Sequence, residues 1–97
     1  MRSKATAKLL AQTDLTCEFL MNFFSKHPES SHNGLREHIE IDPDLLTSKI
    51  DLLKEAGLIS NHTVLDEDGK VVIDRLFSLT REGKKSLIEL GYNIPLN

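Results

Sequence analysis

The first half of the chain carries apolar residues at the spacing of helices. Residues 3–11 (SKATAKLLA) are rich in helix-forming residues and predict a short helix. Residues 13–27 begin with the capping candidates Thr13 and Asp14 and end where Pro28 prevents a helix from continuing. The apolar residues of this second segment surround the helix: Leu15, Cys17, Phe19, Leu20, Met21, Phe23 and Phe24. We therefore expect the core to cover one side, and the first helix, the last helix or a second subunit to cover the other.

Two further helices are expected between residues 34 and 57. Residues 34–40 form a short amphipathic segment in which Leu35 and Ile39 lie one turn apart. Asp42 is a suitable N-cap, and Pro43 occupies the first position of the next helix, where its missing N–H has no partner to lose. That helix places Leu46, Ile50 and Leu53 on one face and ends at Gly57. Two helices joined by a very short turn predict a helix-turn-helix over residues 34–56.

The pattern changes after Gly57. Residues 58–65 and 70–79 are rich in β-branched and apolar residues, and the pair Asp68-Gly69 between them is a strong signal for a hairpin turn. Residues 80–90 then predict a helix with Thr80 as N-cap, which ends at Gly91. The expected fold is α+β, mainly helical with one β-hairpin.

The order of these elements is that of a winged helix-turn-helix, α-α-α-α-β-β-α, in a single domain of residues 1–97. We expect a basic N-terminal helix or arm at 1–12, a three-helix core at 14–57, a wing hairpin at 58–79 and a C-terminal helix at 80–90. The segments LLKEAGLI (52–59), DEDGK at the turn and LTREGKKSLIEL (79–90) resemble MarR-type and PadR-type regulators, and also small winged-helix proteins of phages and mobile elements. The resemblance covers roughly residues 14 to 90.

This resemblance implies a dimeric, DNA-binding transcriptional regulator of bacterial or phage type. Residues 43–56 would enter the major groove and the hairpin would grip the adjacent backbone. By its place after the wing acid, Lys70 would take the role of phosphate contact, with Arg75 as the other candidate on the hairpin. The DNA-contact candidates are Thr47, Ser48, Lys49, Lys70, Arg75, Arg2 and Lys4. We expect the homodimer to form through the first, second and last helices.

The distribution of charge favours a different function. The chain has a formal net charge of −3, and the helical side opposite Leu46 carries Asp44, Ser48, Asp51 and Glu55. Three further acids, Asp66, Glu67 and Asp68, lie at the wing tip. Acids there remove the usual driving force for binding phosphates. The alternative function is therefore a protein-interaction module, whose candidate contacts are Asp44, Leu45, Asp51, Leu52 and Glu55. Leu45 and Leu52 either form an exposed apolar edge or pack under a neighbouring element.

Catalysis, metal binding and membrane insertion are the other functions to consider from the sequence. The single cysteine, Cys17, lies in the most apolar helix and is expected in the core, so we predict no enzyme. His27, His32 and His38 lie near Cys17, Glu37 and Asp42 in the chain, but no two histidines have the i, i+4 spacing of paired metal ligands. We predict no metal and no cofactor. No apolar stretch approaches the roughly 18 residues of a membrane span, and we expect a cytoplasmic protein with no membrane partner.

Overall fold

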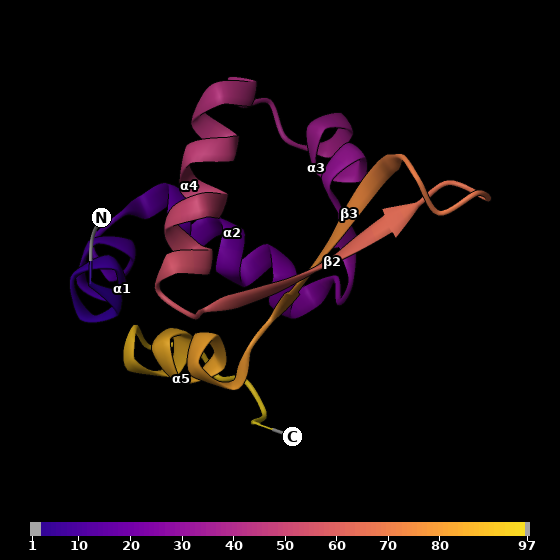
Figure 1. The fold of residues 1–97 in the computed structure, drawn as a ribbon. Coiled ribbons are helices and arrows are strands. Elements are labelled where there is room, and N and C mark those ends of the chain that lie inside the picture. The colour runs from indigo at the N-terminus through magenta and orange to yellow at the C-terminus, as the bar shows by residue number, and fades with distance from the viewer. Residues whose placement is uncertain (1–2, 97) are drawn as a thin grey trace.

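The computed structural model describes residues 3–96, which form five helices and a three-stranded antiparallel sheet in an α+β fold (Figure 1). The elements in chain order are α1 (Lys4–Gln12), α2 (Leu15–Lys26), β1 (Ser30–Ser31), α3 (His32–His38), α4 (Pro43–Glu55), β2 (Ile59–Leu65), β3 (Val72–Leu79) and α5 (Arg81–Glu89). The predicted helices, hairpin and α+β class are all present. None of the helices within residues 3–96 is long and apolar enough to cross a membrane.

Side-chain caps set where the helices begin. The carboxylate of Asp14 accepts hydrogen bonds from the N–H groups of Thr16 at 2.8 Å and Cys17 at 3.1 Å. Asp42 accepts from the N–H of Leu45 at 3.0 Å, and Thr80 accepts from the N–H of Gly83 at 3.1 Å. These bonds satisfy backbone donors that a helix leaves without internal partners. The predicted caps Asp14, Asp42 and Thr80 are confirmed.

The third helix is displaced by two residues from its expected position. The apolar spacing predicts it at residues 34–40, whereas α3 runs from His32 to His38. The hydroxyl oxygen of Ser31 accepts from the N–H of Gly34 at 2.8 Å and so starts the helix earlier. Ile39 then leaves the helix with extended backbone angles, φ −119° and ψ 121°. An unrecognised serine cap accounts for the shift.

The sheet contains a strand that the sequence did not predict. Its order is β1-β3-β2, and Ser30 and Ser31 pair with Phe77 and Leu76. Two polar residues in a loop carry no period of apolar positions, so the pattern contains no signal for a strand. The expected order α-α-α-α-β-β-α therefore lacks β1.

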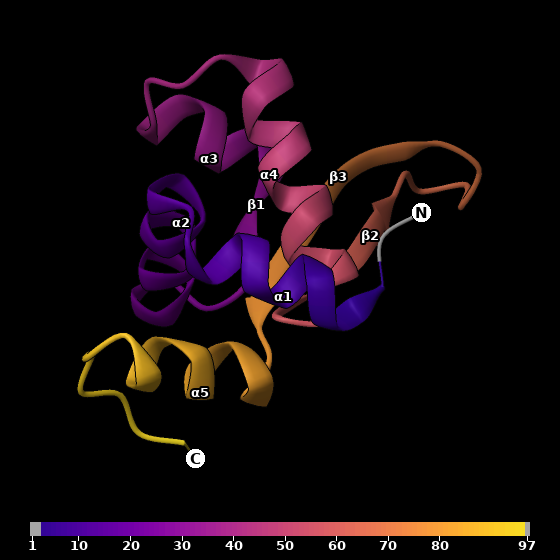
Figure 2. The ribbon, with the colours of Figure 1, turned by 90° about the vertical axis from the view of Figure 1, so that its left-hand side faces the viewer.

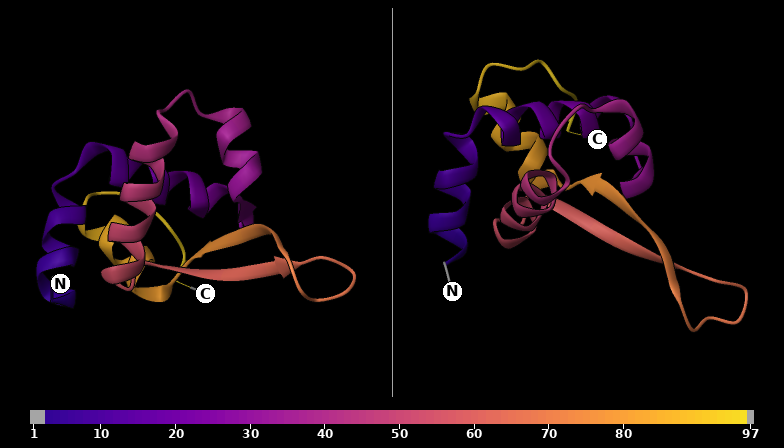
Figure 3. Two further views of the ribbon diagram at one scale, coloured as in Figure 1. Left: turned by 45° about the horizontal axis from the view of Figure 1, so that its top comes forward. Right: turned by 90° about the horizontal axis from the view of Figure 1, so that it is seen from above.

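The β2–β3 hairpin projects away from the helices (Figure 3). The two strands pair along their length from Ile59 with Leu79 to Leu65 with Val72, with an irregularity between Val64 and Leu65. At the turn the N–H of Asp66 donates to the carbonyl of Val71 at 2.9 Å. Gly69 has φ +71°, a conformation that residues with a side chain rarely adopt. The predicted Asp68-Gly69 turn is therefore in place.

The core lies between the helices and β3. Leu46 and Leu53 are 0% exposed and Ile50 is 3% exposed, as their spacing on α4 predicts. Phe24 of α2 packs on Phe77 of β3 with ring centroids 6.0 Å apart. Helix α1 packs against α4 (Figure 2) through small buried side chains that permit a close approach, Ala7 and Ala11. Residues 4–12 are thus a docked helix, which excludes a free arm over that range.

Helix α2 is covered less completely than its composition suggests. It contacts α1, α4, α5 and β3, which bury Cys17, Leu20, Met21 and Phe24. Leu15 and Phe19 nevertheless remain 82% and 53% exposed. Within the described chain, the first and last helices do not cover this side of α2.

Candidate interaction surface

Helix α4 presents the polar side that its periodicity predicts. Asp44, Ser48, Asp51 and Glu55 are exposed on the side opposite the core residues Leu46, Ile50 and Leu53, and Thr47 is exposed next to them. Three of these five side chains are carboxylates. Asp51 lies 3.7 Å from the ammonium of Lys54, a solvent-exposed i, i+3 pair of the kind that contributes little to stability. The outward side of α4 is therefore an acidic surface.

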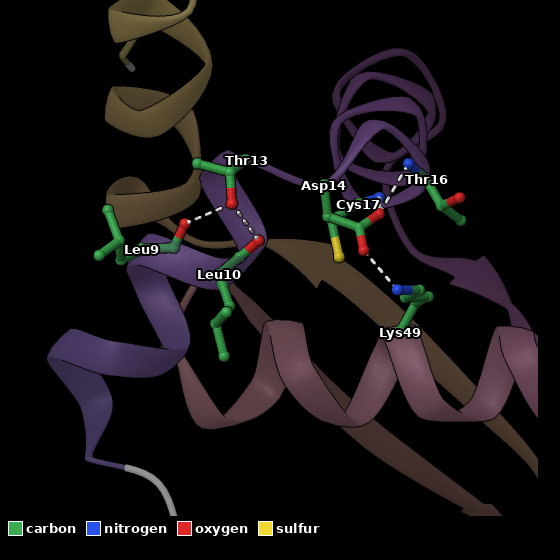
Figure 4. A network of polar contacts seen from close by, with 7 residues as sticks. All are labelled: Leu9, Leu10, Thr13, Asp14, Thr16, Cys17 and Lys49. Atoms are coloured by element: carbon green, nitrogen blue, oxygen red, sulfur yellow. Dashed lines mark hydrogen bonds and ion pairs between the residues drawn. The ribbon is translucent and has the colours of Figure 1, made fainter.

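Lys49, a candidate DNA contact, is already held by another part of the chain. Its ammonium forms an ion pair and hydrogen bond with the carboxylate of Asp14, the residue that caps α2 (Figure 4). Both side chains are mostly buried, with exposed fractions of 23% for Lys49 and 22% for Asp14. The pair links the middle of α4 to the start of α2. Lys49 would have to break this contact to reach a phosphate.

The pair changes the titration of both groups. Burial alone would raise the pKa of Asp14, but hydrogen bonds from Lys49 and from the N–H groups of Cys17 and Thr16 outweigh it and lower that pKa below its ordinary value. The hydrogen bond to Asp14 raises the pKa of Lys49. Both residues are therefore charged at neutral pH.

The two leucines beside the acidic stripe have different environments. Leu52 is 7% exposed and belongs to the core, so it is unsuitable as a contact for a partner. The sequence leaves open whether this pair forms an exposed edge, and for Leu52 the packing alternative is confirmed. Leu45 is 42% exposed. Only Leu45 of the pair is available to a partner.

Leu45 lines a groove that the sequence did not reveal. We name it the α2–α4 groove; it has a volume of about 520 Å³ and is lined by Leu15, Thr16, Phe19, His38, Ile39, Glu40, Ile41 and Leu45. One wall comes from α2, and the other comes from the end of α3, the segment that follows it and the start of α4. The i, i+4 spacing of Leu15 and Phe19 was the available signal. Their exposure depends on where α1 and α5 pack, which spacing does not determine.

The hairpin tip mixes acids with exposed apolar side chains. Glu67 and Asp68 are exposed at the turn. Four apolar side chains beside them are about half exposed: Leu65 at 47%, Val71 at 57%, Val72 at 52% and Ile73 at 55%. Lys70 and Arg75, the candidate phosphate contacts, are exposed on the same hairpin. The hairpin tip therefore exposes acidic, basic and apolar side chains together.

Asp66 has a structural role in the turn. Its carboxylate accepts hydrogen bonds from the N–H groups of Lys70 at 2.9 Å and Val71 at 3.3 Å. These bonds, led by the one from Lys70, lower the pKa of Asp66 although the group is exposed. An aspartate that accepts from its own backbone is a common device for holding a turn. One of the three acids at the hairpin tip is thus explained by local geometry.

Of the basic N-terminal candidates, Lys4 lies on the docked helix α1. Arg2 lies outside the described residues. Lys4 is exposed, but its stem lies against the end of α4, since a Cβ built on Gly57 would lie 2.7 Å from the Cε of Lys4. A cation at the C-terminus of a helix interacts favourably with the helix dipole. The packing of α1 therefore places the Lys4 side chain at the C-terminal end of α4.

Cys17 and the histidines are the remaining candidates for reactive chemistry in the described part of the chain. Cys17 is fully buried, and burial together with the nearby charge of Asp14 raises the pKa of its thiol to about 11. His27 and His38 line a second hollow of about 360 Å³ with Phe23 and Leu35. No group of three or more histidine, cysteine or acidic side chains among the described residues is placed to hold a metal ion.

Comparison of the chain with protein-family models, with curated proteins and with solved structures found no match. The geometry and charge of this surface are therefore the basis for assigning a function. Residues 43–79, which include α4 and the hairpin, contain seven acids and four bases, a net charge of −3.

Proposed function

We propose that this protein is a winged-helix domain that binds another protein through the exposed side of α4 and the adjacent hairpin. The order α2, β1, α3, α4, β2 and β3 supports a winged helix, because a helix-turn-helix is followed by a hairpin whose second strand also pairs with a short strand ahead of α3. The resemblance of residues 52–59 and 79–90 to MarR-type and PadR-type regulators, and to small winged-helix proteins of phages and mobile elements, supports the same fold.

One observation carries the proposal. The surface that such a fold turns toward DNA presents carboxylates and apolar side chains where phosphate binding needs cations. Lys49 is paired with Asp14, and the hairpin tip exposes Val71 and Ile73 beside Glu67 and Asp68. Exposed apolar side chains on a surface with more acids than bases suit a protein partner, to which a buried apolar contact and complementary charge both contribute.

A salt titration tests the proposal. Random-sequence duplex DNA, labelled for fluorescence anisotropy, is titrated with the protein from low to physiological salt. We expect no binding at low salt, because non-specific affinity arises from cations that neutralise phosphates. Reversing the charge of the outward side, with Asp51→Lys and Glu55→Lys together, should create salt-sensitive DNA binding. Glu82→Lys on α5 is the control for a charge change elsewhere. Salt-sensitive binding by the unchanged protein would refute the proposal.

A DNA-binding transcriptional regulator is the second candidate function. Lys70 and Arg75 are exposed on the hairpin, and Thr47 and Ser48 are exposed on α4, which favours it. A homodimer would present two such surfaces, and α1 and α5 carry exposed apolar residues for its interface: Leu9 at 63%, Leu10 at 43% and Ile88 at 40%. If DNA binds, Lys70→Ala and Arg75→Ala should each reduce the salt dependence by about one phosphate contact. Sedimentation over a concentration series tests the dimer.

A further inference from the structure

A ridge of apolar side chains runs along the open side of α2. Leu15, Phe19 and Phe23 follow one another at i, i+4 and i+8, so they form one row on the helix surface. Leu15 is 82% exposed, Phe19 is 53% exposed and Phe23 is half-buried. The row spans about 12 Å, or slightly more than two helical turns. Nothing in the described chain covers its first two members.

Two hollows lie side by side along this ridge. The α2–α4 groove, of about 520 Å³, contains Leu15 and Phe19, and the hollow of about 360 Å³ contains Phe23 and His27. His38 lines both, so the two hollows adjoin beside α2. The wall opposite α2, the far wall, is made by α3, the segment after it and Leu45 at the start of α4. A depression with an i, i+4 ridge as one wall matches the shape of another helix, whose own ridge would lie between the walls.

The charge of the far wall selects the occupant. Residues 36–45 contain Arg36 and four acids, Glu37, Glu40, Asp42 and Asp44, a net charge of −3. Glu40 itself lines the groove, and Glu37 and Asp44 are exposed nearby in the chain. Between α4 and the start of α2, the charges of Lys49 and Asp14 neutralise each other. A second copy of this chain would bring the same acidic wall, whereas a basic helix would complement it.

We infer that the α2–α4 groove binds an amphipathic helix of a partner protein, whose apolar side is bordered by lysine or arginine. The inference rests on the proposed function, since it names the kind of partner that such a domain would bind. Apolar side chains of the helix would cover Leu15, Phe19 and Leu45, and its cations would face Glu40 and Asp44. Apolar burial would supply most of the affinity, and charge would select the basic partner.

Three synthetic peptides of about five helical turns provide the test. The first has leucines at i, i+3, i+4 and i+7 with lysines on both borders, the second has glutamates in place of those lysines, and the third is a scrambled form of the first. Each is labelled and titrated with the full chain by fluorescence anisotropy. We expect the lysine-bordered helix to bind at least tenfold more tightly than either of the others. Equal binding of the glutamate-bordered or scrambled peptide would overturn the inference.

Matched variants locate the binding site. Phe19→Ser should weaken binding of the lysine-bordered peptide at least tenfold, whereas Leu9→Ser removes a similarly exposed apolar side chain from α1 and should leave binding unchanged. Glu40→Lys should shift the preference toward the glutamate-bordered peptide. Because all three side chains lie at the surface, circular dichroism should show the same folded state for each variant. An equal loss in Leu9→Ser would place the contact elsewhere and refute the assignment.

Two further outcomes separate this inference from the proposed function. If the peptides fail to bind and duplex DNA also fails to bind, the groove assignment is wrong while a protein-binding function is retained. If DNA binds with steep salt dependence, the proposed function itself is wrong. Sedimentation tests the other possible occupant, a second copy of this chain. A dimer of the unchanged chain that Phe19→Ser dissociates would show that a second copy fills the groove. That result would overturn the inference of a basic partner helix.

Discussion

Lys49 of α4 is paired with Asp14, the residue whose carboxylate also caps α2. The contact ties two helices that are distant in the sequence, and it engages a lysine that the sequence suggests as a candidate DNA contact. The Asp14 carboxylate also accepts from the N–H groups of Thr16 and Cys17, so one charged group serves the cap and the link between helices. Its titration is therefore coupled to folding.

We predict that the stability contributed by Asp14 is lost in acid. The pKa of Asp14 is lower in the folded state than its ordinary value of 3.8, so the charged form favours folding. This contribution is fully present above the unfolded pKa and disappears as the pH falls through the lower folded pKa. Asp14→Asn keeps a cap acceptor without the charge and should cost about 1–2 kcal/mol at neutral pH.

Urea denaturation of both proteins over a range of pH measures the effect. The difference in free energy of unfolding between the unchanged chain and Asp14→Asn should be constant near neutral pH. It should shrink below about pH 4, as the carboxylate is protonated first in the unfolded chain and then, at lower pH, in the folded chain. Glu67→Gln, at an exposed turn position, is the control and should show a small difference throughout. A difference for Asp14→Asn that does not depend on pH would show that its charge has no part in the effect.

Cys17 should be unreactive in the folded protein. Burial raises the pKa of its thiol to about 11, and the thiolate is the form that attacks a disulfide reagent. With the side chain 0% exposed, modification by Ellman's reagent at neutral pH should proceed only through unfolding, at a rate that rises with denaturant. Unfolded chain provides the control and should react at once. Rapid reaction of the native protein would show that α2 opens locally without global unfolding.

Gly83 allows α5 to pack against the start of the hairpin. A Cβ built at this position would collide with the carbonyl oxygen of Leu58 and with the side chain of Leu79. Alanine favours a helix over glycine by about 1 kcal/mol, but the obstacle is a backbone atom that cannot rotate away. Gly83→Ala should therefore destabilise the protein by about 1–3 kcal/mol, measured by thermal or urea denaturation.

Lys85→Ala, an exposed position on the same helix, is the control for Gly83→Ala and should change stability by no more than about 0.5 kcal/mol.

The neighbouring Thr80 constrains the position of Gly83 further. Its hydroxyl donates to the carbonyl of Gly57 at 2.7 Å and accepts from the N–H of Gly83 at 3.1 Å. A stabilised Gly83→Ala variant would mean that α5 can move away from Leu58 without loss.

The elements set by local chemistry could be predicted from the sequence. Capping residues such as Asp42 and Thr80 act on their own helix, and the period of Leu46, Ile50 and Leu53 defines a buried side whatever covers it. The strand β1 could not be predicted, because Ser30 and Ser31 are extended only through their pairing with β3. Tertiary contacts override weak local preference in such short segments.

The candidate surface was predictable only in part for the same reason. The exposure of Asp44, Asp51 and Glu55 follows from helical period alone. The burial of Leu52 and the pairing of Lys49 depend on how α1 and the start of α2 pack against α4, which period does not specify. The exposure of Leu15 and Phe19, which creates the groove, likewise depends on the paths of α1 and α5.

The acid at position 66 should hold the hairpin turn, and its replacement should loosen that turn alone. The carboxylate of Asp66 accepts from the N–H groups of Lys70 and Val71, so Asp66→Ala leaves both donors to water. Amide hydrogen exchange at Lys70 and Val71 should become faster, while amides of the core helices keep their protection. Glu67→Ala is the matched control: the side chain is one residue away and exposed, and its removal should leave exchange at both amides unchanged. Equal acceleration in the two variants would mean that the two acids act through their charge, and that the hydrogen bonds of Asp66 do not explain why the hairpin turn begins with an aspartate.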